Sequence, residues 1–260
     1  MIFEKIVSHL AETHENVVLF PAVNLSAIPW DFGVILAVLG VVIPWRGMVR
    51  VRRLMKMEDL GASGRLGLYG TTICFQWALG ALVLWRAVAR GMNLASLGLT
   101  ISDPWRTTWM TFLVTLLLCA GQIAGLRKMI QIPAEDRGAL FRITEKIMPR
   151  TRIEVSVFAA LAGTAGLSEE FLYRGFLLAV FARVFAYASG ALLIAICLSS
   201  IWFGAAHLYQ GRRGIITTFV VGMIFAGVRV WSGSLFPAII AHAAVDLVVG
   251  LYVPRLLRKA

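Results

Sequence analysis

A set of ionisable and aromatic side chains in the C-terminal half of the sequence has the residue types and spacings of a hydrolytic site. They form three groups: Glu169, Glu170 and Arg174; Phe203 and His207; His242 and Asp246. Carboxylates and imidazoles are common proton carriers in catalysis. Each group lies in an apolar stretch, where one ionisable side chain costs about 2.5–3.5 kcal/mol on membrane-insertion scales. Residues retained at that cost are candidates for function.

Helical spacing assigns different roles to the two neighbouring glutamates. At about 100° per residue, Glu170 and Arg174 lie within about 40° of each other, whereas Glu169 and Arg174 are about 140° apart. Glu170 is therefore the expected ion-pair partner of Arg174, in a role that is structural or directly catalytic. Glu169 projects elsewhere and is our candidate general base.

The remaining groups complete a model of peptide hydrolysis. His242 and Asp246 are four residues apart, so they face the same way on a helix. A water molecule between Glu169 and His207 would be the nucleophile, and His242 would donate to the oxyanion of the tetrahedral intermediate. Phe203 lies one turn before His207 and is expected to pack beside the imidazole.

A metal-dependent version of this chemistry is the alternative. Glu169, His207, His242 and Asp246 would form a two-histidine, two-carboxylate set acceptable to zinc or another divalent ion. The sequence contains no HExxH helix, and its three cysteines form no CxxC pair. We favour water activation without a metal, and we expect no cofactor.

The elements that position these residues are expected to be transmembrane helices. Hydrophobic residues make up 59% of the 260 and charged residues only 15%, which is too apolar for a water-soluble domain. A crossing helix needs about 20 apolar residues. The candidate segments are Ile28 to Trp45, Leu66 to Trp85, Thr107 to Leu126, Val155 to Val184, Ala188 to Ala206, Gly214 to Val228 and Gly233 to Val253. The predicted fold is an all-α, polytopic transmembrane bundle of about seven spans, or eight if the fourth segment crosses twice.

The distribution of basic residues predicts the orientation. Most of the 25 lysines and arginines fall between alternate spans or after the last one, at 46–65, 127–152, 212–213 and 255–259. The positive-inside rule then predicts an N-terminus outside and a C-terminus in the cytoplasm. Two passes in the fourth segment would weaken this asymmetry, so we favour one long helix. The expected location is the cell membrane of a bacterium or archaeon.

The predicted organisation has five parts. An amphipathic surface segment (1–27) precedes three N-terminal transmembrane helices (28–126). A basic cytoplasmic loop (127–152) leads to the catalytic transmembrane core (153–254), and a basic cytoplasmic tail (255–260) follows. The net charge of +11 is held in clusters between apolar stretches, which argues against nucleic-acid binding. The expected partners are the lipid bilayer and a membrane-associated protein or peptide substrate.

Depth in the membrane raises one difficulty. Glu169 lies midway along the fourth segment, whereas His207 follows the predicted cytoplasmic end of the fifth. Straight perpendicular helices would place the two residues at different depths. Either the fourth helix begins in the membrane interface, or the fifth extends past His207.

Taken in order, the three groups resemble the motifs of the CPBP family of intramembrane proteases. The motifs read Glu169-Glu170-x3-Arg174, Phe203-x3-His207 and His242-x3-Asp246. The family includes the CAAX prenyl endopeptidases and bacterial bacteriocin-processing or self-immunity proteins. The resemblance covers roughly residues 150 to 250. It implies an endopeptidase in which the first glutamate and the second-motif histidine activate water, while the third motif supports the oxyanion.

The third motif departs from the family pattern. Its last position is asparagine in the endopeptidase branch, and here it is Asp246. An asparagine amide can donate to an oxyanion, but an ionised carboxylate cannot. Asp246 is thus protonated, or orients His242, or binds a metal. A non-catalytic scaffold or immunity factor and a proton-coupled transporter remain alternative functions, although we find no internal repeat typical of a transporter.

Overall fold

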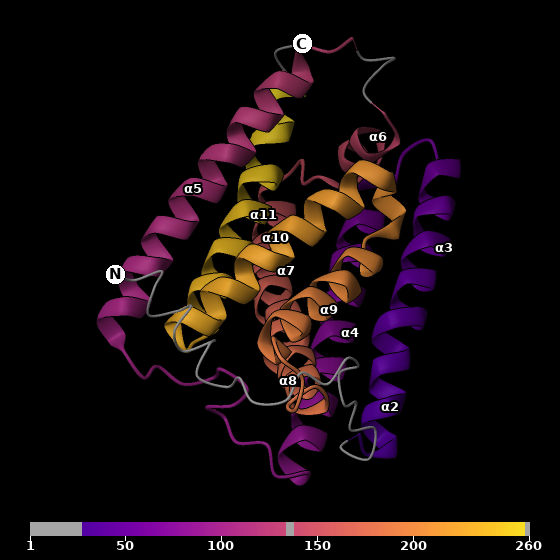
Figure 1. Ribbon diagram of the computed structural model, residues 1–260. Helices are drawn as coiled ribbons and strands as arrows, with labels where there is room; N and C mark the ends of the chain where they lie inside the picture. Colours follow the sequence, from indigo (N-terminus) through magenta and orange to yellow (C-terminus); the bar gives the residue numbers. More distant parts are fainter. Residues whose placement is uncertain (1–27, 134–137, 258–260) are drawn as a thin grey trace.

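The computed structural model describes residues 28–133 and 138–257, and every regular element in these ranges is a helix (Figure 1). The predicted surface segment 1–27 lies outside the described residues. In chain order the helices are α2 (Trp30–Ala37), the π-helical turn η2 (Val38–Val42), α3 (Ile43–Lys56), α4 (Gly61–Ala89), α5 (Pro104–Ile130), α6 (Gly138–Ile147), α7 (Arg152–Glu170), the π-helical turn η4 (Phe171–Leu177), α8 (Leu178–Val184), α9 (Ala191–Ala206), the 3-10 turn η5 (Leu208–Gln210), α10 (Gly211–Ser232) and α11 (Phe236–Leu257).

Six continuous helical runs of the described chain are long and apolar enough to cross a membrane. They are Trp30–Lys56, Gly61–Ala89, Pro104–Ile130, Arg152–Val184, Leu208–Ser232 and Phe236–Pro254. The chain is a multi-pass integral membrane protein with an all-helical fold, as predicted. The fifth predicted span differs, because its helix α9 has only 16 residues. At about 1.5 Å per residue it is about 24 Å long, shorter than a hydrocarbon core of about 30 Å.

The fourth predicted segment is one uninterrupted helix from Arg152 to Val184, so it does not cross twice. Its middle turn, η4, directly follows Glu170 and is π-helical. Every residue of η4 is buried. π-helical turns inside α-helices are frequent at functional sites.

The first span is longer than predicted. The sequence placed its end at Trp45, where basic residues begin, but the helix continues to Lys56. Arg46 and Arg50 therefore lie on a helix that continues the first predicted span, and not in a loop. Arg50 is held there by hydrogen bonds to α4, and the guanidinium of Arg46 lies 4.1 Å from the centre of the Phe75 ring.

The region predicted as a basic loop contains a short helix. Residues 127–130 continue α5, α6 spans Gly138–Ile147, and α7 begins at Arg152. The ends of α3 and α11 lie near α6 at one end of the bundle, and α8 lies toward the other end (Figure 1). The predicted cytoplasmic tail is partly helical, because α11 continues to Leu257.

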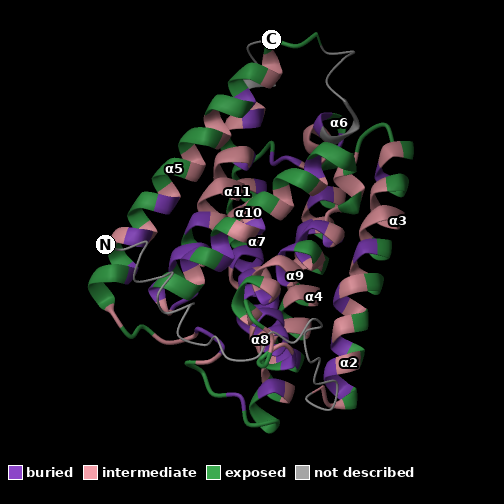
Figure 2. Ribbon diagram, viewed as in Figure 1, coloured by how far each residue is buried: buried purple, intermediate pink, exposed green. Residues whose placement is uncertain are grey.

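Apolar side chains face outward as well as inward, as lipid solvation requires. Large apolar residues such as Phe112, Leu117 and Trp105 on α5 are exposed. Buried residues gather around α7 and α8 in the centre, while α3 and α5 present many exposed residues (Figure 2). The fourth span is therefore the central helix of the bundle.

Small residues bring the site-bearing helices close together. A Cβ atom at Gly166 on α7 would lie 2.7 Å from the backbone oxygen of Ile239 on α11. A Cβ atom at Gly222 on α10 would lie 3.1 Å from Arg174 Nη2. These two glycines let α11 and α10 pack directly against the segment that carries the glutamates and Arg174.

Candidate active site

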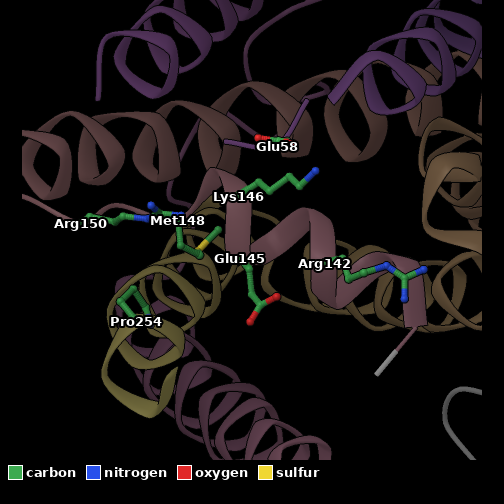
Figure 3. A pocket seen from close by; sticks show the side chains of 7 residues that line it. All are labelled: Glu58, Arg142, Glu145, Lys146, Met148, Arg150 and Pro254. Atoms are coloured by element: carbon green, nitrogen blue, oxygen red, sulfur yellow. The ribbon is translucent and has the colours of Figure 1, made fainter. Parts of the chain in front are cut away.

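A cavity of about 160 Å³ contains two of the predicted catalytic residues, Glu169 and His207. Its other lining residues come from α3, α4, the fourth span, α9 and η5: Ile43, Arg46, Gly47, Arg50, Thr72, Phe75, Gln76, Leu79, Leu172, Tyr173, Ala206 and Tyr209. A larger cavity of about 630 Å³ lies near α6, which contributes Arg142, Glu145 and Lys146 to its lining (Figure 3). It contains none of the predicted site residues, so the smaller cavity is the candidate site.

Glu169 reaches this cavity from the last turn of α7. Its Oε1 accepts a hydrogen bond from Gln76 Nε2 at 3.0 Å. Its Oε2 lies 4.0 Å from His242 Nε2. The side chain is 23% exposed, in contrast to the 0% of the adjacent Glu170. Glu169 is thus held by one donor and keeps an oxygen available to the cavity.

Glu170 is fully buried and accepts from two donors. Its Oε1 accepts from Arg174 Nη1 at 3.0 Å and lies 2.7 Å from His242 Nδ1. The contact with His242 was not foreseen from the sequence, which related Glu170 only to Arg174. A carboxylate shared between a guanidinium and an imidazole fixes the orientation of both.

Phe203 lies at the centre of the charged cluster and is buried. The guanidinium of Arg174 lies 4.0 Å from its ring centroid, a cation–π contact. The rings of His207 and His242 lie 4.7 Å and 6.2 Å from it, centroid to centroid. One aromatic side chain therefore contacts Arg174 and both candidate histidines.

His207 caps the C-terminal end of α9, and a backbone carbonyl of that helix determines which nitrogen of the imidazole carries the hydrogen. Nδ1 lies 2.8 Å from the carbonyl oxygen of Phe203. A carbonyl can only accept, so Nδ1 carries the hydrogen. In the neutral ring Nε2 is then an acceptor, available to a water molecule.

His242 places its second nitrogen between two carboxylates. Nε2 is 3.8 Å from Asp246 Oδ2 and 4.0 Å from Glu169 Oε2. These distances exceed a direct hydrogen bond but suit an ion pair or a bridging water. Asp246 is the more open of these groups, with 39% of its side chain exposed against 12% for His242. Glu170, rather than Asp246, makes the short contact that orients the imidazole.

The difficulty with depth is resolved by unequal helix lengths. The fourth span begins at Arg152, well before the predicted Val155, and Glu169 lies about 22 Å from its Val184 end by the helical rise. Helix α9 runs only about 24 Å before it ends at Ala206. Glu169 and His207 therefore line the same cavity because α9 is short, and α9 does not extend past His207.

The predicted metal ligands do not form a metal site in the described structure. Among the residues that the structure describes, no group of three or more histidine, cysteine, aspartate or glutamate side chains is arranged to hold a metal ion. Glu170, which binds His242 most closely, is already shared with Arg174. The mechanism proposed below uses no metal ion.

Residues 151–248, which carry all three motifs, match the family model described as Type II CAAX prenyl endopeptidase Rce1-like. The chain carries a domain of this endopeptidase family. This membership implies a protease that acts on membrane-embedded substrates. No curated protein and no solved structure matches the chain.

Several cavity residues outside the endopeptidase domain were missed by sequence reasoning. Gln76, Arg46 and Arg50 belong to α3 and α4, which precede the matched range. A signal for Gln76 was present, because an amide in an apolar span is costly unless it has a partner. The sequence offered no means of linking it to Glu169, which is distant along the chain.

Proposed function

We propose that the protein is an intramembrane endopeptidase in which Glu169 and His207 activate a water molecule. The observation that carries the proposal is that both side chains line one cavity, each with an acceptor atom directed away from its structural partner. Glu169 Oε1 accepts a hydrogen bond from Gln76, and His207 Nδ1 donates one to the Phe203 carbonyl. Glu169 Oε2 and His207 Nε2 remain for the two hydrogens of a water.

Bond formation follows from this arrangement. The water oxygen attacks the carbonyl carbon of the scissile peptide, and Glu169 takes the proton that the water loses. His207 holds the second hydrogen and so directs the oxygen lone pair toward the substrate. A tetrahedral intermediate with a negatively charged oxygen results.

His242 is the proposed oxyanion donor. Its Nδ1 donates to Glu170, so its Nε2 can donate to the oxyanion only when the ring is a charged imidazolium. Three carboxylates, Glu169, Glu170 and Asp246, lie around this ring, and Arg174 is the guanidinium that offsets them. Without a proton on His242 the cluster carries an excess of negative charge, so the surroundings stabilise the imidazolium. Asp246 would then stabilise the charge on His242 and not donate itself.

Collapse of the intermediate completes the reaction. Glu169 returns its proton to the departing amine nitrogen, the carbon–nitrogen bond breaks, and the carbonyl reforms as a carboxylic acid. One water is consumed, and the two products are a new C-terminus and a new N-terminus. Glu169 ends ionised and ready for another cycle.

The decisive experiment compares the purified wild type with Glu169→Ala on candidate membrane-bound substrates. We expect loss of cleavage with almost unchanged expression and melting temperature, because Glu169 is partly exposed and makes one side-chain hydrogen bond. Full activity of this variant would overturn the mechanism. No cleavage by the wild type would favour the non-catalytic scaffold.

A further inference from the structure

Two arginines on α3 share the cavity with Glu169 and His207. Arg46 and Arg50 are four residues apart, so their side chains lie on one face of the helix. Both line the cavity. They precede the matched range 151–248, so the family match assigns them no role.

Among the described residues, the groups that hydrogen-bond Arg50 are all neutral. Its Nη1 donates to Thr72 Oγ1 at 2.9 Å, and its Nη2 donates to Thr71 Oγ1 at 3.1 Å and to the Leu68 carbonyl at 3.3 Å. Another cation, Arg46, lies one turn away on the same helix. These bonds hold the guanidinium in place without neutralising its charge.

Arg46 also lacks an anionic partner within the described part of the chain. Its guanidinium lies 4.1 Å from the centroid of the Phe75 ring, and no described carboxylate forms an ion pair with either arginine. Arg65, Arg86 and Arg174, which lie on other spans, each have a carboxylate oxygen within 3.0 Å. Other arginines of the spans, such as Arg127 and Arg229, also bond only neutral groups among the described residues. What distinguishes Arg46 and Arg50 is that both line the cavity that contains Glu169 and His207.

An anion would complete this arrangement. Two like charges at positions i and i+4 repel each other, and an anion between them turns that repulsion into two attractions. The guanidinium fork of Arg46 matches the geometry of a carboxylate and can bind it through paired hydrogen bonds. Arg50, whose two Nη2 hydrogens are already donated, would add its charge and its remaining N–H groups. Because Arg50 is already fixed, little side-chain freedom is lost on binding.

We infer that Arg46 and Arg50 form a subsite for a carboxylate of the peptide substrate. The inference rests on the proposed peptidase function and names the substrate chemistry that the site selects. A cavity of about 160 Å³ holds only a short stretch of peptide, so the carboxylate lies close to the scissile bond. It is supplied either by the C-terminus of the substrate or by an acidic side chain.

The test measures binding separately from cleavage. The probe is a fluorescent prenylated peptide that ends in a CAAX motif, prepared as the free acid and as the C-terminal carboxamide. Fluorescence anisotropy with Glu169→Gln protein in detergent gives the affinities without hydrolysis. We expect the acid to bind about tenfold to a hundredfold more tightly than the amide, the range of one charge-assisted hydrogen-bonded pair.

Matched variants assign that preference to the arginines. Arg46→Gln combined with Arg50→Gln should abolish it, whereas Arg53→Gln should not, because Arg53 is an exposed residue of α3 outside the cavity lining. Arg46→Lys combined with Arg50→Lys keeps both charges and should retain part of the preference for the acid over the amide. This variant separates the effect of lost charge from misfolding. A carboxamide peptide whose last residue is replaced by glutamate tests the second source of the carboxylate. If this peptide binds as tightly as the free acid, a side-chain carboxylate is sufficient for binding at the subsite.

Two results would overturn the inference. One is equal affinity of the Glu169→Gln protein for acid and amide, whether or not the wild type cleaves them. The other is loss of the acid preference in phosphatidylserine nanodiscs but not in phosphatidylcholine nanodiscs, which would assign the arginines to lipid headgroups. If the acid preference holds but the wild type cleaves neither peptide, the peptidase proposal fails and the subsite stands.

Discussion

Replacing Glu170 with alanine removes the acceptor of two donors at once, one buried and one partly buried. Arg174 Nη1 and His242 Nδ1 approach its Oε1 at 3.0 Å and 2.7 Å, and the Glu170 and Arg174 side chains are 0% exposed. Removing one partner of a buried ion pair costs about 3–5 kcal/mol, because the other charge stays buried. We expect Glu170→Ala near the upper end of that range. Arg174→Ala should fall near the lower end, because Glu170 keeps His242.

The measurement is thermal unfolding of the purified variants in one detergent. For soluble domains of comparable size, 1 kcal/mol shifts the melting temperature by about 2–4 °C, so these variants should lose about 6–20 °C. Arg150→Ala is the control. Its ion pair with Asp59 at 3.2 Å is about half exposed on both sides, and such pairs contribute about 0–1 kcal/mol.

The double variant tests whether the charges act as a pair. Each single substitution leaves an uncompensated charge, but the Glu170→Ala, Arg174→Ala double variant leaves neither. Its loss should therefore be smaller than the sum of the two single losses. Strictly additive losses, or a Glu170→Ala melting temperature within the control range, would refute this account of the cluster.

Three further predictions address the site and the topology. Gln76→Leu should slow cleavage by about tenfold or more with little change in melting temperature. The substitution removes a hydrogen bond to the charged Glu169, and such bonds contribute about 1.5–3 kcal/mol. Unchanged single-turnover rates would exclude this positioning role. Asp246→Asn should retain appreciable activity, and chelators should leave the wild type active. The contrary result is cleavage that chelators abolish and zinc restores, together with stoichiometric metal in the purified enzyme, and it would establish a metalloprotease. Single cysteines at Lys128 and Lys259 in a cysteine-free background should be labelled only from the cytoplasm of intact cells, and external labelling of both would reverse the orientation.

The long helices were largely predictable from the sequence, because each is marked by an apolar run, whereas α6 lies in a segment predicted as a loop. The predicted span Thr107 to Leu126 falls inside α5, and the fourth segment is a single helix as expected. The helix of the first span continues past the predicted end for a physical reason. Apolarity stops at Arg46, but the helix does not, since Arg50 finds hydrogen-bond acceptors on α4.

The site was predictable only along each helix and not between helices. The four-residue spacing of Glu170 and Arg174 placed them on one face, and the structure has them 3.0 Å apart. The short contact between Glu170 and His242 depends on how α7 and α11 are rotated about their axes. Small residues such as Gly166 set that packing, and their effect on rotation is not encoded in any local pattern.

The residues that line the cavity come from two parts of the chain. Glu169 and His207 come from the endopeptidase domain, whereas Gln76, Arg46 and Arg50 come from helices that precede it. If the first group reacts and the second binds, substitutions in the two groups should have different kinetic effects. Loss of Glu169 or His207 should lower kcat, because those interactions act in the transition state. Loss of the arginines should mainly raise KM, since a carboxylate that takes no part in bond breaking is bound equally in the ground state and the transition state. Chains that share this endopeptidase domain but differ in their first helices would then cleave by one mechanism and select different peptides.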